Sequence, residues 1–186
     1  MRPPTTIDTP RLRLRPVDKG DAAAIFDYAG AERPTLYMNF PRHRDREESI
    51  AFANRCADSW MSGAAFPWAI VQKADDGLMG VIELRLSPPK GDFGYILGER
   101  FWGNGFATEA ARAVVDWAFN QSGIFRVWAT CHPDNVASAK VLKKAGLRLE
   151  ATLANWEARP QLGELAGPSL SFARTRMPQR QQQTST

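Results

Sequence analysis

The chain has 186 residues, of which 44% are hydrophobic, and it carries a formal net charge of +4 with a pI near 9.3. It is long enough for one well-buried core, and no apolar run approaches the roughly 20 residues of a membrane span. Two cysteines, two histidines and no Cys-x-x-Cys pair are too few for a disulfide framework or a structural metal site. The basic residues are scattered, so we expect no dedicated nucleic-acid binding.

The N-terminus and the cysteines indicate the compartment. Arg2 is not followed by an apolar segment, so no secretory signal is visible. Cys56 falls in a helical pattern and Cys131 ends a predicted strand, and both are interpreted as small buried hydrophobic residues in a reducing environment. We therefore expect a cytoplasmic protein with no membrane contact, either a monomer or a homodimer.

Apolar periodicity predicts a mixed α/β domain over residues 1–177. Helices are expected at 18–29, 45–61, 106–120 and 135–145. Strands are expected at 12–15 (as a sheet edge), 68–71, 79–84, 91–98, 125–131, 148–156 and 170–176. Asp75-Asp76-Gly77 favours a hairpin between the second and third of these strands. Residues 178–186 are rich in Gln, Ser and Thr, and we expect this tail to be disordered.

The segment from Arg100 to Glu109 reads Arg-Phe-Trp-Gly-Asn-Gly-Phe-Ala-Thr-Glu, between a predicted strand and a predicted helix. Glycine allows close backbone approach, and the first N–H groups of a helix are free to bind an anion. Asn104-Gly105 could instead form a hairpin turn, but the 3.6-residue period after it opposes a second strand. A glycine pair that only serves packing is the other alternative. Thr108 stands where a Rossmann turn needs a third glycine, and the Gly-Lys-Ser/Thr of a P-loop is absent.

Three motifs in this order resemble one family. Arg-x-x-Gly-x-Gly at the strand-to-helix turn is similar to the acetyl-CoA loop of the GNAT N-acetyltransferases. Asn135-Val136-Ala137-Ser138, followed by 142–147 (Leu-Lys-Lys-Ala-Gly-Leu), resembles that family's second signature. The N-terminal segment 9–15 (Thr-Pro-Arg-Leu-Arg-Leu-Arg) and the sequence of residues 102–109 resemble those of the RimJ/RimL-type ribosomal-protein branch. The resemblance covers Thr9 to about Arg176. It implies the GNAT fold, a mixed, mostly antiparallel sheet of about seven strands flanked by about four helices.

The resemblance also implies an enzyme, an acyltransferase that uses acetyl-CoA and no metal. In that family the strand before the glycine turn and the strand after its helix splay apart around the pantetheine arm. Main-chain groups of Tyr95, Ile96 and Leu97 would meet the arm here, and one N–H could polarise the thioester carbonyl. The signature residues Asn135 and Ser138 would also contact the cofactor. The diphosphate would be bound by these residues of the turn: Arg100, Gly103, Asn104, Gly105, Phe106 and Ala107.

Acetyl transfer to an amine needs a base and a partner for the leaving thiolate. The tyrosine acid of many GNAT enzymes is missing, because Leu142 stands seven residues after Asn135. Ser138 lies one helical turn beyond Asn135 and is the predicted acid or thiolate partner; the alternative is a helix serine that bonds back to a carbonyl. Glu157 is predicted to be the base and Glu83 to bind the substrate amine, although either carboxylate could serve as the base.

The acceptor is predicted to be a primary amine, specifically the N-terminal α-amine of a peptide or protein. The segment between the first two helices is a usual acceptor wall in similar enzymes, and here it contains Arg33, Arg42, His43, Arg44 and Arg46. Such a wall would repel a polycationic acceptor. Trp60, Trp68 and Trp156 could line an apolar slot, although core packing is the alternative and is favoured for most of them. Two other functions stay open, an acetyltransferase for small-molecule amines or amino acids and a non-catalytic acyl-CoA-binding module.

Overall fold

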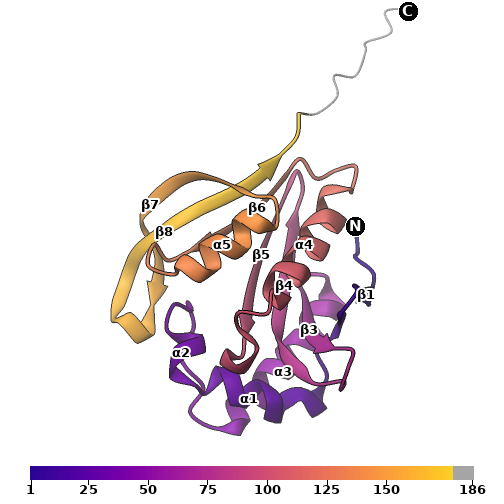
Figure 1. The fold of residues 1–186 in the computed structure, drawn as a ribbon, viewed down its shortest axis with the longest axis vertical. Helices are drawn as coiled ribbons and strands as arrows, with labels where there is room; N and C mark the ends of the chain where they lie inside the picture. The colour runs from indigo at the N-terminus through magenta and orange to yellow at the C-terminus, as the bar shows by residue number, and fades with distance from the viewer. Residues whose placement is uncertain (178–186) are drawn as a thin grey trace, which may run out of the picture.

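The computed structural model describes residues 1–177, so the tail 178–186, expected to be disordered, lies outside the described residues. One sheet contains eight strands in the order β1-β2-β3-β4-β5-β6-β8-β7 (Figure 1). All neighbouring strands are antiparallel except β5 and β6. The strands are β1 Ile7–Asp8, β2 Leu12–Pro16, β3 Phe66–Gln72, β4 Leu78–Ser87, β5 Lys90–Leu97, β6 Arg126–Cys131, β7 Arg148–Arg159 and β8 Glu164–Thr175.

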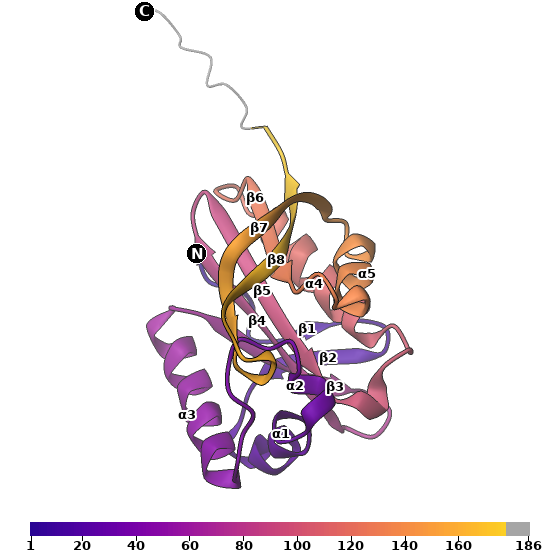
Figure 2. The same cartoon turned by 90° about the vertical axis from the view of Figure 1, so that its left-hand side faces the viewer.

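Helices cover both faces of this sheet (Figure 2). The described residues form the α-helices α1 Ala22–Ala29, α2 Glu32–Thr35, α3 Arg46–Ser62, α4 Phe106–Phe119 and α5 Val136–Lys144. Side chains alternate across β3, where Trp68 and Ile70 pack in the core that contains α4, while Ala69 and Val71 face the core of α1 and α3. The apolar stripe predicted for α4 is buried in the first of these cores. None of the helices in residues 1–177 has the length and apolarity that a membrane span requires.

The predicted mixed, mostly antiparallel sheet flanked by helices is confirmed, with one strand and one helix more than expected. The strand at 12–15 was expected at the sheet edge, but the two-residue β1 pairs with it and takes that place. The hairpin at Asp75-Asp76-Gly77 joins β3 to β4, with Asp76 at φ 54°. The burial expected for Cys56 and Cys131 is also confirmed.

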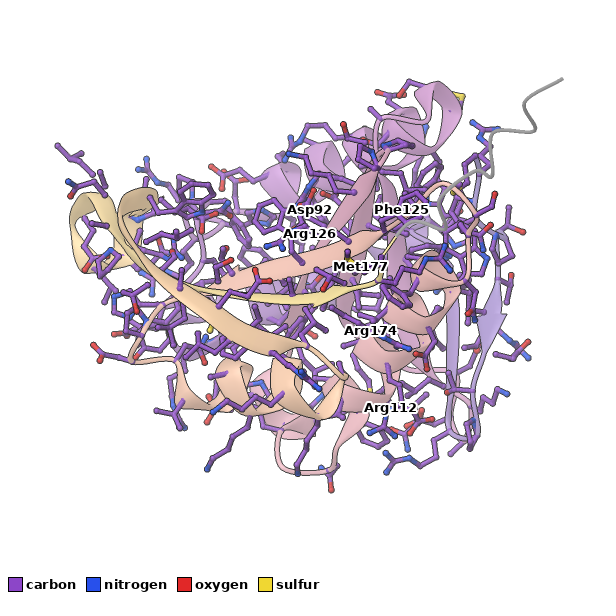
Figure 3. All side chains as sticks on the ribbon, turned by 90° about the horizontal axis from the view of Figure 1, so that it is seen from above. Asp92, Arg112, Phe125, Arg126, Arg174 and Met177 are labelled. Carbon is purple, nitrogen blue, oxygen red and sulfur yellow. The ribbon has the colours of Figure 1, made fainter. Side chains whose placement is uncertain are left out.

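The feature of the fold that matters most for function is the divergence of β5 from β6. These parallel strands pair only through Lys90, Gly91 and Asp92 of β5 with Arg126 to Trp128 of β6. Figure 3 labels Asp92 and Arg126 at the end of the sheet where the two strands still lie together. Beyond Asp92, β6 continues beside β8, and the β6-facing edge of β5 is left unpaired. The splay implied by the family resemblance is therefore present.

Candidate active site

Two cavities adjoin the diverging ends of β5 and β6. The larger cavity, about 480 Å³, lies between the end of β5, the glycine turn and α5. The smaller cavity, about 250 Å³, lies between β4, β5, β6, β7 and the connection from α1 to α3. Residues common to both mark where they meet, namely Tyr37, Met38, Tyr95, Ile96, Asn135 and Ser138. A bound molecule in each could therefore bring a reacting group to this junction.

Most residues expected to contact the cofactor line the larger cavity. They are Tyr95, Ile96, Leu97, Gly103, Gly105, Phe106, Ala107, Asn135 and Ser138. Arg100 instead places its guanidinium 4.6 Å from the centre of the Phe101 ring. Asn104 turns its amide toward the carbonyls of Phe101 and Trp102, at 3.4 and 3.1 Å. These last two side chains therefore do not line the cavity.

The glycine turn has the backbone conformation that an anion site needs. Gly103 and Gly105 have φ of +79° and +78°, the left-handed region that other residues rarely adopt. Gly105 is the N-cap of α4, and no side chain within residues 1–177 caps this helix end. The N–H groups of the first turn of α4 are therefore free to bind an anion from the cavity. Together with the unpaired edge of β5, this turn fits a CoA molecule.

Three basic residues lie at the larger cavity, of which the two lysines were not anticipated from the sequence and Arg33 was expected at the acceptor wall. Lys140 and Lys144 lie one helical turn apart on α5, and Arg33 comes from α2. The i, i+4 spacing of the two lysines is visible in the sequence, but it does not reveal which face of α5 lines a cavity. Arg33 forms an ion pair with Glu99 and lies 5.5 Å from the Trp102 ring centre. These charges suit the phosphates of a CoA molecule.

Ser138 lies at the junction of the two cavities, where its hydroxyl meets a second hydroxyl. The side chain of Asn135 caps α5 by accepting a hydrogen bond from the Ser138 N–H at 3.0 Å. The Tyr95 hydroxyl donates to Ser138 Oγ at 3.0 Å. Within residues 1–177, no carbonyl accepts a hydrogen bond from Ser138, unlike Thr35 and Ser62, which bond back along their helices. The Cys131 thiol is the other hydrogen-bond partner of Ser138, so the Ser138 hydroxyl hydrogen reaches another acceptor only by turning away from that sulfur.

From the sequence, only the main chain of Tyr95 was expected to take part in the site, by contacting the cofactor. Its side chain is partly buried, and this burial raises its pKa far above the ordinary value, partly opposed by the hydrogen bond with Ser138. Tyr95 therefore stays protonated at any working pH and remains a hydrogen-bond donor. The alternation of β5 indicated which residues share a face, but the partner of the hydroxyl comes from α5, more than forty residues further along the chain.

Glu157 lines the smaller cavity near the end of β7, where three neighbours hold its carboxylate. Asn39 Nδ2 donates to Oε1 at 2.6 Å, Arg159 Nη2 lies 2.9 Å from Oε2, and Thr130 Oγ1 lies 3.5 Å from Oε2. Arg159 is 2% exposed and also donates to Ser169 at 3.2 Å. These contacts fix the carboxylate, because a buried guanidinium has little freedom to move. The sequence did not reveal Asn39 or Arg159 as neighbours.

Glu83 reaches the same cavity from β4, on the face opposite the buried side chains of Ile82 and Leu84, as the period of two predicts. Its carboxylate pairs with Arg85, which also binds Asp92. The structure therefore brings both candidate carboxylates to one cavity, each beside an arginine. Each carboxylate pairs with an arginine two residues along its own strand, and Glu157 is also contacted from β6 by Thr130 and from the connection between α1 and α3 by Asn39.

The wall of the smaller cavity differs from the basic wall expected for the acceptor. The connection between α1 and α3 contributes Tyr37, Met38, Asn39 and Phe40. Arg33 lies at the larger cavity, and His43 is buried against Ser49 at 2.8 Å. The remaining members of the expected wall, Arg42, Arg44 and Arg46, lie elsewhere on this connection and at the start of α3. The argument from repulsion of polycations therefore does not apply to this cavity.

The three tryptophans considered for an apolar slot also lie outside the smaller cavity. Trp68 is fully buried, and Trp60 packs against it with ring centres 5.3 Å apart. Trp156 is 49% exposed and makes an edge contact with Trp128 at 6.4 Å. Core packing, the alternative, therefore holds for Trp60 and Trp68. The apolar side chains that do line the cavity are those of Met38, Phe40, Phe52, Val81, Phe93, Ile96, Ala129 and Leu142.

Cys131 lines the smaller cavity but is poorly suited to be a nucleophile. Burial raises the pKa of its thiol to about 11, although a hydrogen bond with Ser138 and the charge of Arg159 oppose the shift. Near neutral pH the residue is therefore a thiol and not a thiolate. This favours direct attack by an amine over a covalent enzyme intermediate.

The alkylation rate of Cys131 should reveal this pKa. Iodoacetamide labelling, measured by mass spectrometry, should be slow at pH 7 and rise about tenfold per pH unit to pH 10, because only the thiolate reacts. Cys56, whose pKa burial raises to about 12, provides the internal comparison and should react still more slowly. A labelling rate for Cys131 that levels off near pH 8 would contradict the assignment.

Diverging parallel strands beside a glycine turn define the class of protein, the acyl-CoA-dependent transferases. A model of the acetyltransferase (GNAT) domain family matches residues 11–148, which is more than half of the chain. The chain belongs to the GNAT acetyltransferase family and is an acetyl-CoA-dependent N-acetyltransferase.

Individual relatives agree with this family. The N-acetyltransferase YoaA of Bacillus subtilis (strain 168) is 29% identical over 150 residues, which cover 79% of this chain and 85% of the relative. The microcin self-immunity acetyltransferase MccE, solved with acetyl-CoA and AMP, superposes with a TM-score of 0.83 at 18% identity, covering 94% and 98% of the two chains. RimL, a ribosomal alpha-N-protein acetyltransferase solved with coenzyme A, gives 0.79 at 20% identity and covers 91% and 97%. The expected likeness to the RimJ/RimL branch is confirmed at the level of the fold.

Proposed function

We propose that the acceptor is the N-terminal α-amine of a protein or peptide, with Glu157 as the base and Ser138 as the partner of the leaving thiolate. The observation that carries this proposal is the shared junction of the two cavities, with Ser138 at the junction and Glu157 on the wall of the smaller one. The likeness of the fold to RimL, whose name describes an alpha-N-protein acetyltransferase, supports the choice of acceptor.

In this proposal each protein group has one task. The Glu157 carboxylate takes a proton from the amine, directly or through a water, so that the nitrogen lone pair is free to attack. The new N–C bond replaces the C–S bond of the thioester, and the electrons of that bond leave with the sulfur. Ser138 turns its hydroxyl hydrogen from the Cys131 thiol toward this sulfur, while Tyr95 occupies the other side of Ser138 Oγ. Direct transfer needs no protein nucleophile, which agrees with the raised pKa of Cys131.

Ser138→Ala should lower kcat by roughly 10- to 100-fold, the scale of one hydrogen bond to a charged group, and leave CoA affinity nearly unchanged. Tyr95→Phe should lower kcat less, because it removes only the donor that orients Ser138. In the Ser138→Ala background, Tyr95→Phe should have little further effect, because the two groups act through one contact. Steady-state kinetics of the four proteins measure this coupling.

Tyr28→Phe is the matched control for the tyrosine, since the Tyr28 hydroxyl is buried, lies outside both cavities and has no hydrogen-bond partner among the described residues. This control should keep its kcat. Full activity of Ser138→Ala would remove the assigned role and leave release of an unassisted thiolate.

The acceptor class can be tested by a panel of amines with acetyl-CoA, with release of free thiol as the readout. The panel should contain peptides with different N-terminal residues, the same peptides with blocked N-termini, free amino acids and small amines. Turnover of the free peptides alone would support the proposal. Turnover of free small amines but not peptides would overturn it, and CoA binding without turnover on any amine would favour a binding module.

A small-molecule amine is the second candidate, and hydrogen bonds between two segments at the smaller cavity favour it. Gln161 donates to the carbonyls of Thr35 and Phe40 at 2.6 and 3.0 Å, and Asn39 donates to Glu157. These bonds join the connection between α1 and α3 to the β7–β8 hairpin, which lie side by side in Figures 1 and 2. A cavity of about 250 Å³ beside these joined segments admits only a short part of a peptide. The MccE structure, which holds AMP beside acetyl-CoA, belongs to a protein of this fold with a small molecule bound.

A further inference from the structure

The N-terminal segment before β2 forms an ion-paired cluster with the first turns of α4. Thr9 Oγ1 donates to Glu109 Oε1 at 2.6 Å, and the backbone N–H of Arg11 donates to the same oxygen at 2.9 Å. Arg11 Nε donates to Oε2 at 2.7 Å. Nothing in the sequence indicated that these two segments lie together. In the structure one carboxylate joins them across about a hundred residues.

Arg11 extends this cluster to the glycine turn itself. Its Nη1 donates to the carbonyl of Asn104 at 3.0 Å, and its guanidinium lies 4.6 Å from the centre of the Phe106 ring. Asn104 and Phe106 flank Gly105, so Arg11 contacts the residues on both sides of the second glycine. We propose that Glu109, with Thr9 and Arg11, is a positioning residue that holds the glycine turn in the conformation that binds the diphosphate of CoA.

A carboxylate close to an anion-binding turn would ordinarily oppose its function. A free acidic side chain in the first turns of a helix can accept hydrogen bonds from the same N–H groups that an anion needs. Here both oxygens of Glu109 accept from Thr9 and Arg11, and no side chain caps α4. Arg11 also neutralises the charge. The arrangement therefore keeps the amides of the turn available and limits repulsion of the phosphates.

The turn needs external support because of its glycines. Gly103 and Gly105 both have positive φ, and an added Cβ at Gly103 would meet nothing within 4 Å. Glycine allows the backbone more conformations than any other residue does, so a turn with two glycines is flexible unless other contacts hold it. Ordering a flexible turn costs entropy when a ligand binds. Glu109 is well placed to reduce it, since its side chain is only 16% exposed. Partial burial opposes ionisation, but the bonds from Thr9 and Arg11 outweigh it and hold the pKa of Glu109 below its ordinary value.

The test is Glu109→Gln, which keeps the shape and removes the charge. CoA affinity, measured by calorimetry, should fall by about tenfold, the scale of one charge-assisted contact. Affinity for pantetheine, which lacks the phosphates, should stay the same when it is titrated by NMR. Amide hydrogen exchange at residues 103–107 of the free protein should become faster, because the turn has lost its support.

Asp116→Asn is the matched control, because it makes the same charge change on the same helix and breaks the ion pair with Arg174 at 2.7 Å. This control should leave CoA affinity and exchange in the turn unchanged. Thr9→Val removes the hydrogen bond to Glu109 and two to the Leu12 backbone, but no charge, so it should shift both readouts in the same direction as Glu109→Gln but less. It replaces that variant if Glu109→Gln does not fold. Unchanged CoA affinity in folded Glu109→Gln, or an equal loss for CoA and pantetheine, would overturn the proposal.

Discussion

Gly105→Val is expected to weaken CoA binding by roughly 100-fold or more while most of the fold persists. Gly105 has φ +78°, and a β-branched residue in this region is a strong outlier. An added Cβ would meet only Arg11 Nη2, at 3.6 Å, so the damage comes from the backbone and not from crowding. As the turn relaxes, the first N–H groups of α4, beside the larger cavity, lose the arrangement that lets them bind one anion together. Losing one or two charge-assisted hydrogen bonds, at about 1.5–3 kcal/mol each, accounts for the expected factor.

The control for this variant is Gly63→Val. Gly63 ends α3 at φ +74°, has open space around its added Cβ and lies outside both cavities. The two variants should lower the melting temperature by similar amounts, because a left-handed residue other than glycine costs about 1–2 kcal/mol. Calorimetric titration should show normal CoA binding for Gly63→Val only. Equal CoA affinity in the two folded variants would remove the glycine turn from the cofactor site.

Glu157→Gln is expected to lower the rate of acetyl transfer by roughly 100-fold or more near neutral pH, the scale of general-base catalysis. Glutamine keeps the size of the side chain and can still accept from Asn39, but it does not accept a proton. The α-amine of a peptide has a pKa of about 8, so the free amine becomes abundant at higher pH. The loss should therefore shrink as pH rises from 7 to 9.5. A pH–rate profile of kcat/KM measures this trend.

Two further variants make this test specific. Glu150→Gln on the same strand β7 breaks an ion pair with Arg126 but lies outside both cavities, so it should retain full activity. Glu83→Gln tests the other carboxylate at the smaller cavity. An active Glu157→Gln together with an inactive Glu83→Gln would move the role of base to Glu83. A loss in Glu157→Gln that is the same at every pH would indicate that the carboxylate positions the acceptor.

The central strands and long helices could be predicted because their periodic patterns follow from burial. β3, β4 and α4 pack apolar side chains in the cores, so alternation and the 3.6-residue period are visible in the sequence. β7 is an edge strand of the sheet and is exposed along most of its length. Its alternation of apolar and polar residues is therefore weak, and the strand predicted from the sequence stopped short of the true end at Arg159. Gly167 and Pro168 obscured the first half of β8. α2 is four residues long, too short to show a period.

The same distinction applies to the candidate site. The glycine turn and the Asn135–Ser138 cap were visible in the sequence because each depends on residues within one or two turns of a helix, where backbone geometry fixes what can meet. The contacts of Glu157 with Asn39, of Tyr95 with Ser138 and of Arg11 with Glu109 join residues 43 to 118 positions apart. Local propensity does not specify which of many polar side chains meet at such separations. These partners come within hydrogen-bond distance because the connection between α1 and α3 meets the β7–β8 hairpin, α5 lies at the open edge of β5, and the start of β2 lies beside α4.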